Sequence, residues 1–518
     1  MVDQVVIGID VGTGGCKTVA FDLEGHLIAE AFREYPIHHP RMDWAEQDPD
    51  DWWRTTCATL REVISKLDPG SILAVGLTSQ REAFVPLDRR GRKLYDSIIW
   101  LDMRTIPQEE EIKRLISPER VLRVTGLPVD YIFSAAKLLW FKKNLPNVFK
   151  SIDRILFAKD YVAFKLCGEI ATDYSMASRT MLFDIHRLCW SEEVCEALDI
   201  PVSILPKVIG SWEIVGEVTG EASESTGLPS GTPVVSGGGD RPCEALGAGV
   251  FVEGDINIGT GTGTVIEVPL SKPLPDPKGL IDCCCHVVPK TWEYEVIINA
   301  TGGSLRWFRD NFGYEEVSRS REEGTSPYAI FDQMASDVPV GSNGLFYYPY
   351  LWGARAPKFD PLARSAFIGF TYAHGKPAFL RSILEGVAFQ YIETLDLVRD
   401  LGVQIKRITM TGGEAKSRLW TQIKADVLGV SIEVPEVLDA AALGACILAA
   451  MGVGAYRDFD SAVRKMVRVS RIYHPRPETH EKYVKLYEAY QEVYNRYKEC
   501  FEILAKIASL GLEGSNGS

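Results

Sequence analysis

The distribution of apolar positions predicts short strands at the start of the chain. Range 4–10 (QVVIGID) has almost no polar residues, which is typical of a strand buried on both faces. After a glycine-rich turn at 12–15, range 17–22 (KTVAFD) returns to a strand pattern, and a third strand (HLIAEA) follows the turn at 22–25. Two strands joined by such a turn differ from the strand–turn–helix of a dinucleotide-binding fold.

Helical and strand patterns alternate along the following residues. Range 48–67 opens with acidic residues and a proline, as helices commonly do, and range 72–78 is a predicted strand. Range 134–144 has a second helical pattern. Farther along, a strand at 405–411 precedes a Gly-Gly turn and a helix that begins at Arg418. This alternation predicts an α/β protein.

The strand–glycine turn–strand plan recurs about half the chain later. Range 256–270 (INIGTGTGTVIEVPL) repeats it and indicates two related halves. We therefore expect an N-terminal domain over 1–246 and a C-terminal domain over 247–480. A helical tail is expected over 481–518, because apolar and aromatic residues of 482–504 recur at helical intervals.

Composition narrows the class of protein. The 518 residues include 46% hydrophobic and 24% charged side chains, as in globular proteins with two or three domains. The formal net charge of −14 disfavours a nucleic acid or an anionic membrane as partner. No signal peptide and no run of about 18 apolar residues is evident, so we expect a cytoplasmic protein without a membrane interaction. A homodimer is compatible with the sequence, which contains no signal that fixes the oligomeric state.

The cysteines do not form a metal-binding pattern. There are 11, and the run Cys283, Cys284 and Cys285 is followed by His286. No CxxC spacing occurs, and three adjacent side chains on a strand cannot all face one ion. We expect this run to be a packed strand with reduced thiols.

The first candidate site is the segment from Asp10 to Lys17 (DVGTGGCK). Its glycines let backbone N–H groups approach an anion, and Thr13 adds a hydroxyl donor. Asp10 would repel a phosphate unless Mg²⁺ bridges the carboxylate and the phosphate. The alternative is a hairpin turn with a solvated acidic residue.

Two further glycine turns could contact a nucleotide. The segment Gly259–Thr264 alternates three glycines with three hydroxyl residues, which is more than a hairpin requires. Together with the first turn, it predicts a phosphate-binding site. The turn that begins at Thr411 offers a flat backbone surface for a purine, although a plain strand-to-helix turn is equally compatible with it.

The fourth candidate is Asp240, which follows three glycines at the end of a predicted strand. An exposed carboxylate there could accept the proton of a hydroxyl that attacks phosphorus. The alternative role for this aspartate is a helix N-cap.

These motifs resemble, in order and spacing, those of the FGGY carbohydrate kinases. The resemblance extends from about Val5 to about Ala455. It also includes two segments similar to the signature patterns of the family, 133–140 and 366–385, with departures at Ile132 and Ala378.

The resemblance implies two actin-like (ribonuclease-H-like) ATPase domains of the α/β class, with ATP and Mg²⁺ in a cleft between them. It makes Asp240 the catalytic base and Asp10 the residue that organises the metal. The residues expected to bind ATP are Thr13, Gly14, Lys17, Thr260, Gly261, Thr262, Gly302, Arg306, Gly412, Gly413 and Ser417.

The resemblance also implies an acceptor pocket for a small molecule. Its expected residues are Gln80, Arg81, Glu82, Trp100, Asp102, Asp240 and Arg241. The Arg-Glu pair is similar to glycerol kinases, which carry a tyrosine where this chain has Ile132. Range 350–357 is instead similar to xylulokinases, and range 305–310 to autoinducer-2 kinases.

We therefore expect ATP-dependent phosphorylation of a small sugar or polyol, with a ketopentose such as D-xylulose first. Glycerol, a four-carbon polyol or an autoinducer-2-type sugar are the alternatives. An actin-like nucleotide switch is a more distant one, disfavoured because a switch has no use for the acid after three glycines or for the polar acceptor residues.

Overall fold

The computed structural model describes residues 4–512, which divide into two compact units. Unit 1 comprises the chain up to Glu253 together with Glu267–Glu295 and Asp439–Arg468. Unit 2 comprises Gly254–Ile266, Val296–Leu438 and the chain from Val469 onward. The expected domain boundary at 246/247 lies near the end of the first segment of unit 1, whereas two later segments also pack with this unit.

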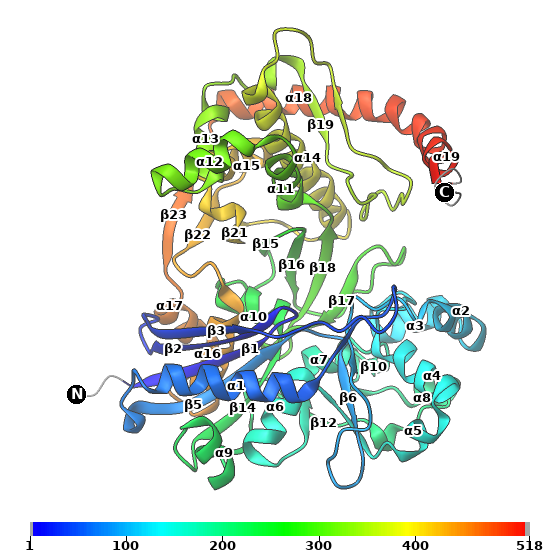
Figure 1. The fold of residues 1–518 in the computed structure, drawn as a ribbon, viewed down its shortest axis with the longest axis vertical. Helices are drawn as coiled ribbons and strands as arrows, with labels where there is room; N and C mark the ends of the chain where they lie inside the picture. The colour runs from blue at the N-terminus through cyan, green and yellow to red at the C-terminus, as the bar shows by residue number, and fades with distance from the viewer. Residues whose placement is uncertain (1–3, 513–518) are drawn as a thin grey trace. The chain divides into compact units, whose positions relative to one another are not determined.

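A six-stranded sheet forms the centre of unit 1, in the order β13-β14-β5-β1-β2-β3 (Figure 1). Its strands are β1 (Val5–Val11), β2 (Gly15–Asp22), β3 (Leu27–Glu34), β5 (Ile72–Ser79), β13 (Ile214–Glu217) and β14 (Pro233–Gly239). β1 is antiparallel to β2 and parallel to β5, which is in turn parallel to β14. The carboxyl ends of β1, β5 and β14 therefore lie at one edge of the sheet.

The two faces of β1 are covered differently. Ile7, Ile9 and Val11 belong to a core shared with residues of α1 (Pro49–Ile64) and α6 (Ala158–Cys167). On the opposite face, a Cβ at Gly8 would clash with a backbone carbonyl oxygen of α16 (Ala440–Gly452). Because only a glycine allows this close approach, α16 packs directly on the sheet and belongs to unit 1.

The other elements of unit 1 pack around this sheet or contribute to a second hydrophobic core, which contains no residue of the six strands. The helices are α2 (Ile106–Leu115), α3 (Pro118–Thr125), α4 (Ser134–Asn144), α5 (Pro146–Ser151), α7 (Tyr174–Ser178), α8 (Glu192–Leu198), α9 (Gly220–Thr226), α10 (Asp240–Gly247) and α17 (Phe459–Met466). Short strand pairs are β4 (Glu46–Gln47) with β7 (Ser97–Ile98), β6 (Phe84–Leu87) with β8 (Arg154–Phe157), β9 (Ala171–Asp173) with β12 (Lys207–Ile209), and β10 (Phe183–Asp184) with β11 (Cys189–Trp190). The helices predicted over 48–67 and 134–144 are confirmed as α1 and α4.

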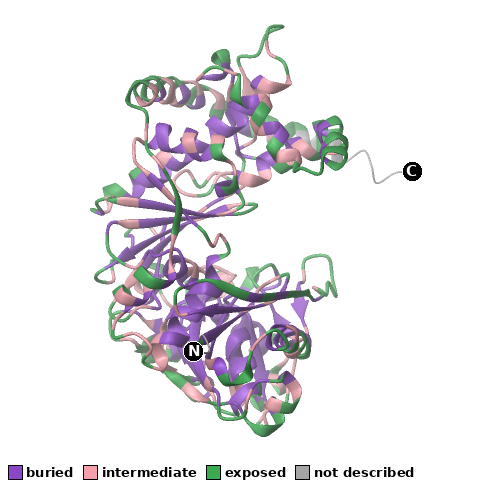
Figure 2. Ribbon diagram, turned by 90° about the vertical axis from the view of Figure 1, so that its left-hand side faces the viewer, coloured by how far each residue is buried: buried purple, intermediate pink, exposed green. Residues whose placement is uncertain are grey.

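A seven-stranded sheet has the order β17-β18-β16-β15-β21-β22-β23. Its strands are β15 (Asp255–Thr260), β16 (Thr264–Leu270), β17 (Asp282–Cys285), β18 (Trp292–Ile298), β21 (Arg407–Gly412), β22 (Ile432–Pro435) and β23 (Val469–Tyr473). β15 is parallel to β21, and β21 to β22, as β1 is to β5 and β5 to β14. The strand–glycine turn–strand plan thus recurs, as predicted. Most residues of the strands in both sheets are buried (Figure 2).

The run of three cysteines is a packed strand, as predicted. Cys283, Cys284 and Cys285 lie in β17, are buried, and pair with residues of β18 in antiparallel register. Burial raises the pKa of each of these thiols. They are therefore protonated, unreactive side chains of the core at neutral pH.

Helices and one strand pair complete unit 2. They are α11 (Thr301–Phe312), α12 (Tyr314–Glu323), α13 (Pro327–Ser336), α14 (Lys376–Asp400), α15 (Arg418–Leu428), α18 (Pro477–Tyr497), α19 (Phe501–Leu512), and β19 (Phe346–Tyr348) with β20 (Ala366–Ile368). The helical pattern expected near the C-terminus is confirmed by α18 and α19, while residues 513–518 lie outside the described range. Tyr490 of α18 stacks on Tyr348, with ring centroids 4.4 Å apart. Along residues 4–512, no helix combines the length and apolarity needed to cross a membrane.

Candidate functional site

The first group of candidate residues gathers where three parallel strands of unit 1 end. Asp10 is the next-to-last residue of β1, Arg81 follows the end of β5, and Asp240 follows β14 directly. In open sheets with parallel strands, the carboxyl ends of the strands are the usual place for ligands. The fold therefore brings together residues that are far apart in the sequence.

The glycine turn between β1 and β2 is held by side chains. The hydroxyl of Thr13 donates to the amide oxygen of Gln80 (3.2 Å) and accepts from the indole N–H of Trp100 (2.9 Å). The side-chain amide of Gln47 donates to the Thr13 carbonyl (2.7 Å) and accepts from Gln80 (2.6 Å). Three predicted residues thus meet here. Gln47 was not predicted, because only tertiary contacts bring it to the turn.

Asp10 lies in an acidic and poorly solvated position. Burial raises the pKa of Asp10 well above its usual range, and the negative charges of Asp439 and Asp240 raise it further. Its Oδ1 atom is buried without a hydrogen-bond partner. A pocket of about 570 Å³ next to it is also lined by Gly12 and Lys17, whose ammonium group is paired with Asp439 (2.8 Å). Asp439 was not predicted.

These observations fit a divalent cation that takes few ligands from the protein. A bound cation would balance the negative charges at this position, and the unpartnered Oδ1 of Asp10 could coordinate it directly. Within residues 4–512, no group of three or more His, Cys, Asp or Glu side chains is arranged to hold a metal ion. This arrangement suits Mg²⁺, which commonly binds one or two carboxylates and takes its other ligands from water and phosphate.

Asp240 is the first residue of α10 and remains accessible. Its side chain is 35% exposed, and its Oδ1 accepts the backbone N–H of Arg241 (2.9 Å). The Nε of Arg81 lies 3.1 Å from the same oxygen. A Cβ at Gly239 would clash with the Arg81 side chain, so the glycine before Asp240 lets the arginine approach.

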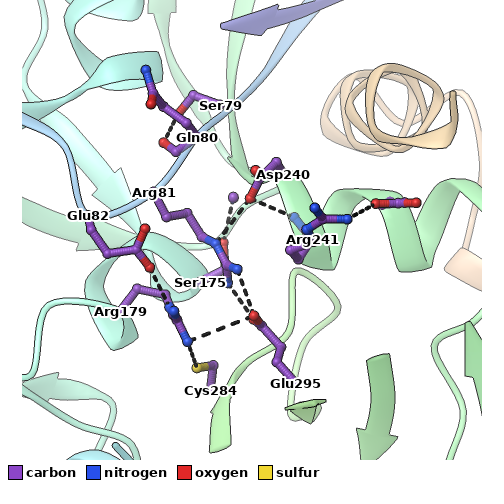
Figure 3. Close-up of polar contacts among 12 residues, drawn as sticks. Ser79, Gln80, Arg81, Glu82, Ser175, Arg179, Asp240, Arg241, Cys284 and Glu295 are labelled. Carbon is purple, nitrogen blue, oxygen red and sulfur yellow. Dashed lines mark hydrogen bonds and ion pairs between the residues drawn. The ribbon is translucent and has the colours of Figure 1, made fainter. Parts of the chain in front are cut away.

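A buried network of charges holds Arg81 (Figure 3). Its two terminal nitrogens bind both carboxylate oxygens of Glu295, one of them at 2.7 Å. Burial alone would raise the pKa of Glu295, but the guanidinium groups of Arg81 and Arg179 lower it to about 2. Arg179 also pairs with Glu82 and Asp282, each at 2.7 Å. Neither Glu295 nor Arg179 was predicted, although acids at alternate positions of an otherwise apolar strand were a signal for Glu295.

The remaining acceptor residues have different surroundings. Asp102 is fully buried and accepts hydrogen bonds from the backbone N–H of Ala45 and from the guanidinium of Arg104. Arg241 donates to Glu244 (2.7 Å). Trp100 is 43% exposed and can offer its ring to a ligand. In this structure Asp102 fixes its loop, while Trp100, Asp240 and Arg241 are the accessible members of the predicted set.

In unit 2, the second glycine turn is built from backbone and hydroxyl groups. Gly261 and Thr262 are exposed at the end of β15. The Thr262 hydroxyl accepts a hydrogen bond from Arg306 (2.9 Å), and its carbonyl accepts one from Gly303 N–H (2.9 Å). A Cβ at Gly302 would clash with the carbonyl oxygen of Gly261, so α11 begins in direct contact with the turn. The predicted residues of this turn and of α11 therefore lie together.

The Gly-Gly turn after β21 joins the same group. Gly412 pairs with Thr260 in the parallel register, and the Gly413 N–H donates to the Thr260 carbonyl (3.1 Å). Gly412 has φ +78°, a left-handed conformation that favours glycine. Gly413 is exposed, and a Cβ added there would have no neighbouring atom within 4 Å, so its backbone offers a flat open surface. Ser417 caps α15 by accepting the Trp420 N–H (2.9 Å).

A buried ion pair directly after this turn supports it. Glu414 accepts hydrogen bonds from Lys424 and from the hydroxyl of Tyr391, and the side chains of both Glu414 and Lys424 are almost fully buried. Burial lowers the pKa of Lys424, and the charge of Glu414 partly opposes that shift. This pair could not be predicted from the local sequence, because Lys424 and Tyr391 reach it from two different helices.

Comparison with known proteins accounts for this combination of fold and residues. Residues 5–247 match the N-terminal domain of the FGGY family of carbohydrate kinases, and residues 256–453 match its C-terminal domain. The chain is 32% identical over 492 residues to a xylulose kinase of Bacillus subtilis, covering 94% of this chain and 96% of the relative. It is 30% identical over 479 residues to a gluconokinase of the same organism, covering 92% and 93%.

A crystal structure of a xylulose kinase from Rhodospirillum rubrum is also similar. Its TM-score is 0.88 with 29% sequence identity, and the match covers 96% of this chain and 100% of the other. The expected fold of two ribonuclease-H-like, actin-like domains is confirmed by this match. The chain belongs to the FGGY family of carbohydrate kinases, and it is a sugar kinase.

Proposed function

We propose that this protein transfers the terminal phosphoryl group of ATP to a hydroxyl group of a ketopentose, with D-xylulose as the first candidate. The observation that carries the proposal is Asp240, an accessible carboxylate at the end of β14 whose Oδ1 is oriented by Arg81 and by a backbone N–H. The similarity to xylulose kinases in sequence and structure supports the choice of sugar.

In this proposal, unit 1 supplies the groups that act on the acceptor. Asp240 accepts the proton of the attacking hydroxyl, because a deprotonating base makes the oxygen a better nucleophile toward phosphorus. Trp100 offers an apolar face for the carbon chain of the sugar. Asp10 is the residue that would hold Mg²⁺, which neutralises charge on the phosphates of ATP.

Unit 2 supplies the proposed nucleotide-binding groups. The exposed backbone and hydroxyl of Thr262 can donate to phosphate oxygens, and Arg306 adds a positive charge beside them. The open backbone of Gly413 is proposed to contact the adenosine. FGGY kinases use ATP as the phosphate donor, and we propose that these residues bind it.

The test is an ADP-release assay with Mg²⁺ and ATP over a panel of ketoses, polyols and aldonates. D-xylulose is expected to give the highest kcat/KM of the panel, and Asp240→Asn is expected to remove the signal. ADP release that does not depend on any acceptor would contradict the proposal. Preference for a different neutral acceptor would replace D-xylulose as the proposed substrate but would leave the kinase activity established.

A glycerol kinase is the second candidate. The adjacent Arg81 and Glu82, which are similar to the glycerol kinase pattern, favour it, and a glycerol kinase of Sulfolobus acidocaldarius is 32% identical to this chain. Phosphorylation of glycerol without use of any ketose in the same assay would establish this alternative.

A further inference from the structure

The charges around Asp240 bear on which acceptors the proposed kinase can use. Arg81 is 6% exposed and has two carboxylate partners, Glu295 and Asp240. Arg179 is 3% exposed and pairs with Glu82 and Asp282. In Figure 3, dashed lines join the carboxylate of Glu295 to both guanidinium groups. Nη1 of Arg179 lies 3.8 Å from the second oxygen of Glu295. Both cations are therefore neutralised within the protein.

The balance of this network is negative. Two guanidinium groups face four carboxylates, those of Asp240, Glu295, Glu82 and Asp282. Burial raises the pKa of Asp282, yet even with this group neutral three carboxylates remain. Glu293 is left out of the count, because burial and the charge of Glu295 raise its pKa well above the usual range.

Neighbouring cations do not change this balance. Arg241 is paired with Glu244 (2.7 Å). Lys137 is fully buried, donates to the backbone carbonyl of Glu82 (2.8 Å), and has its pKa lowered by burial to about 8. Lys137 is therefore closed to a substrate, and a substrate carboxylate could bind Arg241, which is 33% exposed, only in competition with Glu244.

We propose that this network makes the kinase selective for uncharged polyhydroxy acceptors and excludes aldonates. The inference rests on the proposed function, since it assumes that the acceptor binds beside Asp240. A hydroxyl group brings no charge into the site and can give its proton to Asp240. A carboxylate placed there meets the negative charge of Asp240, while Glu295 already occupies the terminal nitrogens of Arg81 and Glu244 already pairs with Arg241. Such like-charge placement is a means of rejecting the wrong ligand.

The first experiment compares acceptors that differ in charge but share a carbon skeleton. The kcat/KM values of the wild-type protein are measured for D-xylulose, xylitol and D-xylonate, and for D-glucitol and D-gluconate. At least one neutral acceptor is expected to exceed both aldonates by about 100-fold or more. A higher kcat/KM for an aldonate would overturn this inference while leaving the kinase activity intact.

The second experiment removes the carboxylate of Glu295 from Arg81. In Glu295→Gln, the terminal nitrogens of Arg81 no longer face a charged partner and only Asp240 remains paired with it, so the ratio of aldonate to neutral kcat/KM is expected to rise about tenfold or more. The double variant Arg81→Gln/Glu295→Gln is expected to lose that gain, because the cation is then absent. An unchanged ratio in folded Glu295→Gln would overturn the assignment to this network.

The matched control is Glu385→Gln in unit 2. Glu385 is also buried and paired with an arginine, Arg381 (2.9 Å), so the substitution tests the loss of a buried carboxylate elsewhere. It is expected to leave the aldonate-to-neutral ratio unchanged. Circular dichroism spectra establish which variants are folded.

A binding measurement separates failure of this inference from failure of the proposed function. Thermal shift assays of the wild-type protein with xylitol and with D-xylonate need no turnover and no variant. Stabilisation by xylitol but not by xylonate supports the inference even if no acceptor is phosphorylated, in which case the proposed function alone fails. Stabilisation by xylonate but not by xylitol overturns the inference.

Discussion

The edges of the two sheets share a topology but differ in their side chains. In unit 1, β1, its glycine turn and the parallel β5 end among charged groups, with Asp10, Arg81 and Asp240 within the same network of electrostatic interactions. In unit 2, the corresponding ends of β15 and β21 present glycines and the hydroxyl of Thr262. The strand order positions backbone turns in both units, and the residues after each strand decide what chemistry is available there.

The buried charges next to the two sheet edges are also arranged differently. The glycine turn after β21 in unit 2 is followed by a compact pair, Glu414 with Lys424, supported by a tyrosine hydroxyl. Unit 1 has a chain of acids and arginines that continues to the accessible Asp240. We interpret the Glu414–Lys424 pair as support for the backbone of the glycine turn. We interpret the network of unit 1 as the means by which the carboxylate of Asp240 is held in position.

The largest expected effect is on the charged edge. Asp240→Asn keeps the shape of the side chain but removes the proposed base, so kcat is expected to fall about 10²–10⁴-fold. Turnover measured at saturating ATP and acceptor tests this expectation, with nucleotide affinity and thermal midpoint as controls for unit 2 and folding. A variant that keeps more than half of the wild-type kcat would show that Asp240 is not the base.

The buried pair of unit 2 allows a comparison of stability with an exposed pair of unit 1. Lys424→Met leaves Glu414 as an unpaired buried charge, which typically costs about 3–5 kcal/mol of unfolding free energy. Lys17→Met is the matched control, because Lys17 is 23% exposed and its partner Asp439 55% exposed, and such pairs contribute about 0–1 kcal/mol. Urea denaturation of both variants tests this, and equal losses would contradict the distinction.

The backbone surface of unit 2 is tested by neighbouring glycines. Gly412→Ala is expected to cost about 1–3 kcal/mol, because φ is +78° and the added methyl group would meet the Thr260 carbonyl. Gly413→Ala meets no atom within 4 Å and is expected to change stability by less than about 0.5 kcal/mol. Denaturation midpoints decide between them, and a larger loss for Gly413→Ala would be inconsistent with this geometry.

The smallest expected effect concerns Asp10 in the metal-free protein. Because burial and neighbouring acids raise the pKa of Asp10 in the folded state, its ionisation costs stability as pH rises from the unfolded pKa of about 3.9 through the folded value. Asp10→Asn should therefore raise the thermal midpoint at pH 7, and the gain should vanish in acid. Added Mg²⁺ with ATP should stabilise the wild type more than this variant. A thermal midpoint of Asp10→Asn that falls below that of the wild type at pH 7, but not in acid, would contradict this prediction.

Sequence reasoning identified the parts of the fold that local pattern determines. The buried strand at 4–10, the turn at 12–15 and the repeat at 256–270 each follow from residues that are adjacent in the chain. The presence of acids at Asp10 and Asp240 could be read in the same way, as could the glycines beside them. The catalytic and binding roles assigned to these residues stay predictions.

The contacts that surround these residues could not be predicted in the same way. Glu295 is 214 residues from Arg81 in sequence, and Asp439 is separated from Lys17 by 422 residues. Such pairs depend on how distant segments pack, and no local periodicity encodes them. For the same reason, the sequence did not indicate that Asp439–Arg468 packs with unit 1, because this segment continues the second half along the chain.

The return of α16 to the first sheet has a consequence for synthesis of the chain. Gly8 lies against this helix, so one face of the sheet stays uncovered until residues up to Gly452 have been made. The ribosome must add about 200 residues after Glu253 before α16 is available. At about 5–20 residues per second, that interval is roughly 10–40 s. During it the backbone around Gly8, which α16 covers in the folded protein, has no covering helix.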